Sequence, residues 1–298
     1  MRLRVATRGS ALALWQAERV VALLQNAEPG LDAEIVRVDT KGDRRLDVPI
    51  WELGGKGVFA KEVQAAVLDG RADVAVHSAK DLPSTTPSGL VIGATPERGD
   101  VRDALVGTTL DGLPEGATVA TGSLRRRAQL AHVRPDLRFE GLRGNMATRL
   151  ARAADVDAIV VAATAFDRLG LSGHITERLD PEVMLPQVAQ GALAVECRTG
   201  DADIRVLLDR VEHGPTRGAV DAERGFLAEL GGDCSLPAAA YATSAGSTLR
   251  IRGLLAAPDG SLLVRHEVCG PVASGPALGR QLARHLLDEQ GGAKLLGR

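Results

Sequence analysis

Residues 72–83 decide the fold of this chain: Ala72-Asp73-Val74-Ala75-Val76-His77-Ser78-Ala79-Lys80-Asp81-Leu82-Pro83. The first five are mostly small and β-branched and follow a turn signal at Asp69-Gly70, which predicts a buried strand. Pro83 and Pro87 then prevent a strand or helix from continuing. The polar residues before them therefore stand at the carboxyl end of a strand, where open α/β sheets bind their ligands.

Two interpretations of Lys80 and Asp81 remain open at this point. A neighbouring lysine and aspartate on a loop are ordinarily a solvated surface pair. Against this, the chain has five lysines among 36 basic residues, and three of the five fall between positions 56 and 80. Because the pKa of a lysine responds to burial while a guanidinium stays charged, this concentration favours a chemical role.

Length and composition narrow the class of protein. A chain of 298 residues is long enough for two or three domains, and with 2% aromatic residues its core must consist of Ala, Val and Leu. The net charge of −2 excludes a uniformly basic nucleic-acid coat. Three widely spaced cysteines form no metal-ligand pattern and favour reduced thiols in a cytoplasm. We find no signal-peptide pattern and no run of membrane-spanning length.

A strand, a turn with Thr, Gly and Ser, and a helix start occur together twice. Residues 3–6 lead through Thr7-Arg8-Gly9-Ser10 to a helix that ends near residue 26. Residues 117–120 lead through Thr121-Gly122-Ser123 to a helix that ends near residue 132. Each turn directs free backbone N–H groups and a positive helix end towards an anion.

The other patterns predict two α/β lobes and a small C-terminal α+β domain. A long connection from residue 41 to residue 57 is typical of a lid, and the strand at 192–196 could return to the first lobe. We place lobe 1 at residues 1–95 and 191–211, lobe 2 at residues 98–188, and the C-terminal domain at residues 214–298.

Positive charge gathers between residues 121 and 152, where eight arginines face two acids, an excess of six. Arginine binds carboxylates and phosphates through a two-pronged fork, so a cleft for a polyanionic ligand is expected. A solvated basic face would explain the same counts. Nucleic-acid binding is a further alternative, although Phe139 is the one aromatic residue in the segment and single-strand binders need stacking platforms.

Taken in order, the motifs resemble those of the porphobilinogen deaminase family, also called hydroxymethylbilane synthases, over essentially the whole chain. The matching stretches are Arg4-Val5-Ala6-Thr7-Arg8-Gly9-Ser10 with Leu14-Trp15-Gln16, Gly54-Gly55-Lys56-Gly57 with Phe59, residues 77–83, Ser123-Leu124-Arg125-Arg126, Leu142-Arg143-Gly144-Asn145 with Thr148-Arg149-Leu150, Gln190-Gly191-Ala192, and Cys234-Ser235-Leu236-Pro237.

The resemblance implies two doubly wound lobes like those of periplasmic binding proteins, with a third domain that presents a cysteine. It also implies the reaction, in which four porphobilinogen molecules lose ammonia and join head to tail into hydroxymethylbilane, a precursor of haem. The cofactor is a dipyrromethane made from the substrate and joined by a thioether, here to Cys234. Cys197 and Cys269 match no functional position, and we expect both in the core.

The resemblance assigns Asp81 as the catalytic residue, with a charge that stabilises a pyrrole cation. A larger set would bind cofactor and substrate, in most cases through carboxylates. These residues are Arg8, Ser10, Lys56, Phe59, Ser78, Lys80, Thr121, Ser123, Arg125, Arg126, Arg143, Gly144, Arg149, Arg168 and Gln190. Three positions depart from the family pattern: Glu52 replaces a lysine, Asp233 a glycine, and Gly122 a serine.

Two other classes stay in view. A two-lobed protein with an anion-lined cleft could bind or sense a ligand without catalysis, and Lys80 could form a Schiff base with a carbonyl substrate. On the resemblance, we expect a cytoplasmic monomer that acts on porphobilinogen and passes its product to uroporphyrinogen-III synthase. We expect neither nucleic acid, membrane nor metal as a partner.

Overall fold

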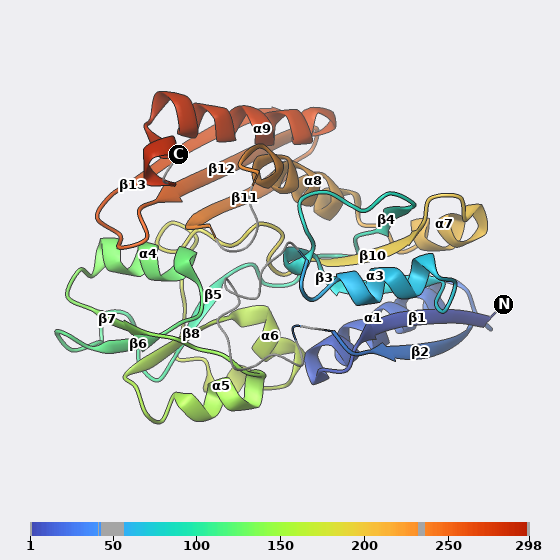
Figure 1. Cartoon of the computed structure of the whole chain (residues 1–298), viewed down its shortest axis with the longest axis horizontal. Helices are drawn as coiled ribbons and strands as arrows, with labels where there is room; N and C mark the ends of the chain where they lie inside the picture. Colours follow the sequence, from blue (N-terminus) through green and yellow to red (C-terminus); the bar gives the residue numbers. More distant parts are fainter. Residues whose placement is uncertain (1, 41, 43–56, 232–235, 297–298) are drawn as a thin grey trace. The chain divides into compact units, whose positions relative to one another are not determined.

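In the computed structural model, which describes residues 2–40, 42, 57–231 and 236–296, the chain forms two five-stranded sheets and one three-stranded sheet (Figure 1). Its residues divide into two compact units. Unit 1 comprises Met1–Gly99 and Gly191–Arg217, and holds one five-stranded sheet. Unit 2 comprises Asp100–Gln190 and Gly218–Arg298, and holds the other two sheets.

The sheet of unit 1 has the strand order β2-β1-β3-β10-β4. Its strands are β1 (Arg2–Arg8), β2 (Asp32–Val38), β3 (Val74–Ser78), β4 (Leu90–Ala94) and β10 (Leu193–Arg198). The first strand runs parallel to β2 and β3, whereas β10 is antiparallel to its neighbours β3 and β4. The chain therefore returns to the first lobe after residue 191, which confirms the expectation for residues 192–196.

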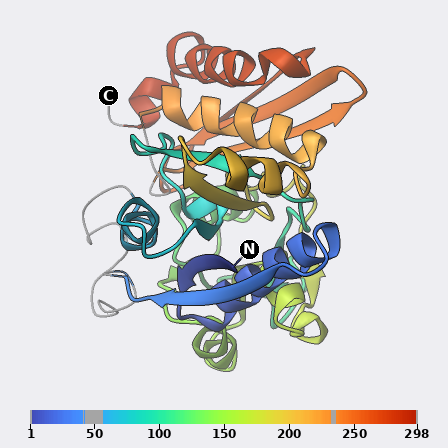
Figure 2. The ribbon, with the colours of Figure 1, turned by 90° about the vertical axis from the view of Figure 1, so that its right-hand side faces the viewer.

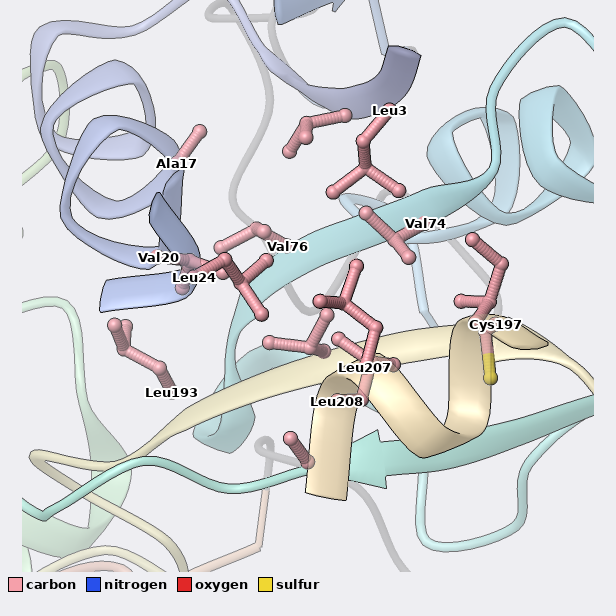
Figure 3. Packing of buried hydrophobic residues seen from close by; sticks show 14 of the residues in the cluster. Leu3, Ala17, Val20, Leu24, Val74, Val76, Leu193, Cys197, Leu207 and Leu208 are labelled. Atoms are coloured by element: carbon pink, nitrogen blue, oxygen red, sulfur yellow. The ribbon is translucent and has the colours of Figure 1, made fainter. Parts of the chain in front are cut away.

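Helices cover both faces of this sheet, so the lobe is doubly wound. Side chains of α1 (Ala11–Ala27) and α7 (Ala202–Asp209) pack on one face with Leu3, Val74 and Val76, as Figure 3 shows. Helix α3 (Lys61–Leu68) packs on the other face. Successive strand residues point to opposite faces, so along the short strand β3 Val74 and Val76 pack on the first face and Ala75 packs on the second.

The five-stranded sheet of unit 2 repeats this order as β7-β6-β8-β5-β9. Its strands are β5 (Asp103–Val106), β6 (Thr118–Ala120), β7 (Arg138–Glu140), β8 (Ala158–Ala162) and β9 (Glu177–Arg178). Here β5 is antiparallel to its neighbours β8 and β9, whereas β6 is parallel to β7 and β8. Helix α4 (Leu124–Val133) covers one face, and α5 (Met146–Arg152) and α6 (Ala163–Arg168) cover the other. The predicted repetition of two lobes is confirmed.

The C-terminal sheet is an antiparallel meander of β11 (Ala238–Ala245), β12 (Thr248–Ala256) and β13 (Leu263–Pro271). Helices α8 (Gly214–Glu229) and α9 (Gly275–Arg284) pack on one face (Figure 2). The packing is close, since a Cβ atom at Gly253 would come within 2.9 Å of both Phe226 and Leu282. A π-helical turn (His285–Glu289) and α10 (Gly292–Leu295) follow. The expected small α+β domain is confirmed, while its boundary at residue 214 stays a prediction.

The structure corrects some expectations, and others concern residues that it does not describe. The sequence patterns missed β4, β5, β9 and α7. Cys197 lies in the core of unit 1 as expected, but Cys269 is exposed on β13, so its assignment to the core was wrong. Glu52, Lys56, Asp233, Cys234 and most of the connection 41–57 lie outside the described residues. Within the described part of the chain, we find no helix long and apolar enough to span a bilayer.

Candidate functional site

The turn after β3 carries the central residues of the predicted site. The strand ends at Ser78, and a single 3₁₀ turn, η2 (Ala79–Asp81), follows before Pro83 ends the regular structure. The N–H of Ala79 donates to the carbonyl oxygen of Ala192 at 3.0 Å. Because Ala192 directly precedes β10, this bond ties the turn to the two middle strands of the sheet. The backbone of Lys80 and Asp81 is therefore held at the strand end that the sequence predicts.

A small recess opens beside this turn, entirely within unit 1. Its cavity volume is about 40 Å³, and its lining is mostly polar or charged. Five of the predicted site residues line it: Arg8, Ser10, Phe59, Ser78 and Asp81. They come from the end of β1, the start of α1, the segment before α3, the end of β3 and the turn η2. The sequence therefore placed in one site residues that lie up to 73 positions apart.

Local contacts fix the recess. The Arg8 guanidinium lies 4.2 Å from the centroid of the Phe59 ring, within the range of a cation–π contact. Ser10 caps α1 by accepting a hydrogen bond from the N–H of Ala13 at 3.3 Å. Gln16, one turn further along α1, donates from Nε2 to Oγ of Ser78 at 2.8 Å. The helix start and the strand end are thus joined by side chains.

A buried polar group behind the turn was not foreseen from the sequence. Nε2 of His77 lies 3.1 Å from Oε2 of Glu196, and Gln64 Nε2 donates to both carboxyl oxygens at 2.9 and 3.1 Å. The three side chains come from β3, β10 and α3. Glu196 and Gln64 sit within apolar patterns that carry no sign of this contact. His77 was noticed as a motif residue, but without a partner.

Unit 2 holds the corresponding turns after its own parallel strands. Thr121 Oγ1 accepts from the N–H of Ser123 at 3.2 Å, and Ser123 caps α4 by accepting from the N–H of Arg126 at 3.4 Å. At the next turn Gly144 has φ +90°, a conformation that favours glycine. Its carbonyl oxygen accepts from Nε of Arg149 at 3.0 Å. The two turns are shaped as the motifs predict.

Arg125 and Arg126 do not form a solvated basic face, which the sequence left open as the alternative to an anion-binding cleft. Both are buried against Asp103, which is 0% exposed at the start of β5. The Arg125 Nη1 atom lies 2.7 Å from Oδ2 of Asp103, and Arg126 reaches Oδ1 from Nε at 2.9 Å and from Nη2 at 2.8 Å. Gln190, also fully buried, donates from Nε2 to the same Oδ1 at 3.0 Å. This group joins three predicted site residues to one missed acid.

The charges of this group shift one another's protonation. Burial alone would raise the pKa of Asp103, but the two guanidinium groups and the donated hydrogen bonds outweigh it and hold the pKa well below its usual range. Burial lowers the pKa of Arg126, although Asp103 opposes this shift. A guanidinium remains protonated at neutral pH nonetheless. Two positive charges therefore share one buried negative charge.

Other arginines of the basic segment are also paired, so the excess of six overstates the charge open to a ligand. Arg134 pairs with Asp136 at 2.8 Å, and Arg152 pairs with Glu140 and Asp155. The Arg127 guanidinium lies 5.8 Å from the centroid of Phe139.

In α6, burial lowers the pKa of Arg168 to about 10, as expected for a cation with little water around it. In the described part of the chain, no group of three or more His, Cys, Asp or Glu is arranged to hold a metal ion.

Comparisons with known proteins place this geometry in a family. The model "Porphobilinogen deaminase, dipyromethane cofactor binding domain" matches residues 3–206, and "Porphobilinogen deaminase, C-terminal domain" matches residues 218–288. A curated porphobilinogen deaminase from Syntrophotalea carbinolica is 48% identical over 290 residues, which is 96% of this chain and 92% of the relative.

Solved structures resemble the chain more distantly. A nutrient binding protein from Burkholderia cenocepacia bound to methionine is 14% identical, with a TM-score of 0.41 over 70% of this chain and 90% of that one. A TRAP periplasmic solute binding protein from Desulfovibrio salexigens is 11% identical, with a TM-score of 0.42 over 71% of this chain and 72% of that one. Nothing about function follows from likeness at this level. The two family models and the 48% identical relative, which together span nearly the whole sequence, show that the chain belongs to the porphobilinogen deaminase family.

Proposed function

We propose that this chain is a hydroxymethylbilane synthase of tetrapyrrole biosynthesis, in which Asp81 carries the chemistry and Cys234 the cofactor. It joins four porphobilinogen molecules head to tail with loss of ammonia and then releases the linear product by hydrolysis. The family match supports the reaction and the dipyrromethane cofactor. The single structural observation that supports the site is the recess where Asp81 meets Arg8, Ser10 and Ser78.

The side chains present suit a ligand with many carboxylates. Porphobilinogen carries an acetate and a propionate, so each added ring brings two negative charges. In unit 2, Nε and Nη2 of Arg125 are buried, and no described residue accepts a hydrogen bond from them. Unpaired buried donors are costly unless a ligand satisfies them. Arg8, at the recess in unit 1, offers the same two-pronged chemistry.

The cofactor, when bound, supplies the pyrrole carbon to which the next ring is joined. We propose that residues of each unit bind carboxylates of the cofactor or of the substrate. The set is Arg8, Ser10, Phe59, Ser78 and Lys80 in unit 1, and Thr121, Ser123, Arg125, Arg126, Arg143, Gly144, Arg149, Arg168 and Gln190 in unit 2. Lys56 and Cys234 belong to the same proposal on the motif match.

Asp81 would act on the substrate as ammonia departs. Loss of ammonia leaves a positive charge delocalised over the pyrrole, and an ionised carboxylate beside the ring N–H stabilises that charge. In its acid form the same group can donate a proton to the departing amine. Lys80, its neighbour in η2, places a positive charge next to it in the chain.

The test is to supply the purified protein with porphobilinogen and to measure ammonia and product together. The proposal requires one ammonia for each porphobilinogen consumed, and a linear tetrapyrrole as product. A protein that binds porphobilinogen without releasing ammonia would instead be a ligand-binding or sensing protein. Reduction with borohydride tests the alternative of a Schiff-base enzyme, because a Schiff base on Lys80 would be trapped as a secondary amine.

The finer points of the proposal rest on the sequence. We propose that the protein acts as a monomer in the cytoplasm and passes its product to uroporphyrinogen-III synthase. We also propose a division into lobe 1, lobe 2 and a C-terminal domain at residues 95–98, 188–191 and 211–214. Size-exclusion chromatography with light scattering tests the monomeric state, and limited proteolysis at these three segments tests the domain division.

A further inference from the structure

Asp103 is a buried carboxylate to which the catalytic scheme gives no task. It stands at the first position of β5, the antiparallel strand of its sheet, and faces the first turn of α4. The Arg125 and Arg126 side chains reach it from that turn, at distances of 2.7 to 2.9 Å. Gln190 completes the group; it is the last residue of the first of the two segments that form unit 2.

Charge and hydrogen bonding are unbalanced within this group. Two guanidinium groups face one carboxylate, and the positive end of α4 adds to the excess. Arg126 is well satisfied, because Nη1 also donates to the carbonyl oxygen of Val160 at 3.0 Å. Arg125 is not: Nη1 donates to Leu185 O at 2.8 Å, while Nε and Nη2 are buried with no acceptor among the described residues. The group is thus held together by Asp103 but remains one negative charge short.

We propose that Asp103 determines the specificity of the arginine pair by acting as a built-in competitor for external anions. Its carboxylate occupies the two guanidinium groups in the unloaded protein, so a small free anion must compete with it and binds weakly. A ligand with several carboxylates gains further contacts outside the pair and overcomes this competition. Specificity then comes from disfavouring the wrong anion as much as from attracting the right one. The inference rests on the proposed function, since it takes the pair to receive a carboxylate-bearing ligand.

The experiment measures the binding of inorganic phosphate to unloaded full-length protein. Cys234→Ala provides a parent without a covalent adduct, and intact mass confirms that state. Phosphate affinity is measured by thermal shift and calorimetry at pH 7 and constant ionic strength. We compare the parent with Asp103→Asn and with Asp103→Asn/Arg126→Gln. The double variant keeps the parent's net charge but lacks the internal carboxylate, so it separates competition from simple attraction.

We expect phosphate to bind both variants at least about tenfold more tightly than the parent, because no Asp103 carboxylate competes with it for the guanidinium groups. Asp136→Asn is the matched control, since it removes a carboxylate from a half-buried Arg–Asp pair elsewhere in the same unit, and it should leave phosphate affinity unchanged. A double variant that binds phosphate no more tightly than the parent would overturn the proposal.

Folding failure is also informative in this design. Removal of a partner from a buried ion pair is strongly destabilising, so Asp103→Asn can fail to fold in phosphate-free buffer. A variant that folds once phosphate is present supports the proposal, because the external anion then replaces Asp103. If the double variant remains unfolded in saturating phosphate, the proposal is wrong. The proposed function is tested separately by ammonia release from Asp103-containing enzyme, so the two can fail independently.

Discussion

The Nε2 atom of His77 lies 3.1 Å from Oε2 of Glu196, and both side chains are almost completely buried, with 4% and 1% of their surface exposed. The contact joins β3 to β10, and Gln64 adds α3 to the same carboxylate. It lies directly before the turn that carries Lys80 and Asp81. A buried polar contact thus lies at the end of the strand that leads into η2 and the proposed catalytic carboxylate.

Replacement of Glu196 by leucine should destabilise the protein. Glu196→Leu leaves the Gln64 amide buried without its acceptor, which costs about 1–3 kcal/mol, and it removes the carboxylate beside the His77 ring. Urea unfolding at pH 7 measures the change. Glu34→Leu is the control, because Glu34 pairs with Arg2 at the surface with 48% of its side chain exposed, and we expect a much smaller loss there. Equal losses for the two variants would show that the buried contact does not stabilise the lobe.

Asp81→Asn should yield folded protein with slow deamination. The substitution keeps the shape of the side chain but removes the charge that faces the pyrrole cation, which typically lowers the rate by about 10²–10³-fold. Asp81→Glu retains the charge and should keep measurable turnover. Ammonia release in a single turnover, with the melting temperature as the check on folding, distinguishes the two. Near-normal release by the asparagine variant would rule out the electrostatic role.

Acid stability should depend in part on Asp73. Burial would raise the pKa of its carboxyl, but hydrogen bonds and charge from Arg4 outweigh it and lower the pKa. Asp73 therefore contributes stability above its unfolded pKa of about 3.9, and loses it as the pH falls through the lower folded value. The difference in unfolding free energy between the wild-type protein and Asp73→Asn should be constant from pH 7 to pH 5 and should decrease below about pH 4. A gap that widens on acidification would reverse the assigned shift.

Restoring the family's serine at position 122 should be harmful. A Cβ atom added at Gly122 would lie 2.6 Å from the carbonyl oxygen of Leu142, so the backbone after β6 or after β7 would have to move. Overpacking of this kind typically costs about 1–3 kcal/mol, and Gly122→Ala should show the same loss as Gly122→Ser. Gly141→Ala is the matched control in the same lobe, since its Cβ would meet nothing within 4 Å. A stabilised Gly122→Ser would mean that the turn adapts without strain.

Local patterns in the sequence predicted the parallel strands and their helix starts well. Strand β3 is short, begins with apolar residues and is followed by Pro83, and Ser10, Ser123 and Asn145 cap helices as their residue types favour. The missed strands β4, β5 and β9 are short, and all three pair with antiparallel strands that are distant in sequence. Such elements are set by tertiary pairing rather than by local pattern.

Asp103 shows why part of the site could not be predicted. A charge count over residues 121–152 excludes an acid that lies 22 and 23 positions before Arg125 and Arg126, although the fold brings them within 3 Å. Glu196 was hidden in the same way within an apolar strand. Cys269 was misassigned because alternation along β13 puts it on the exposed face. Sequence reasoning found residues that form motifs, and missed partners that only the folded chain supplies.

The most direct test of the account is the intact mass of the purified wild-type protein compared with its sequence mass. Two bound pyrrole units should appear as a single covalent adduct, which peptide mapping should place on Cys234 and which should give a pink colour with an acidic aldehyde reagent. Cys234→Ala should fold and carry no adduct. A wild-type protein at its bare sequence mass that nevertheless forms hydroxymethylbilane, or an adduct that maps to Cys197 or Cys269, would contradict the account.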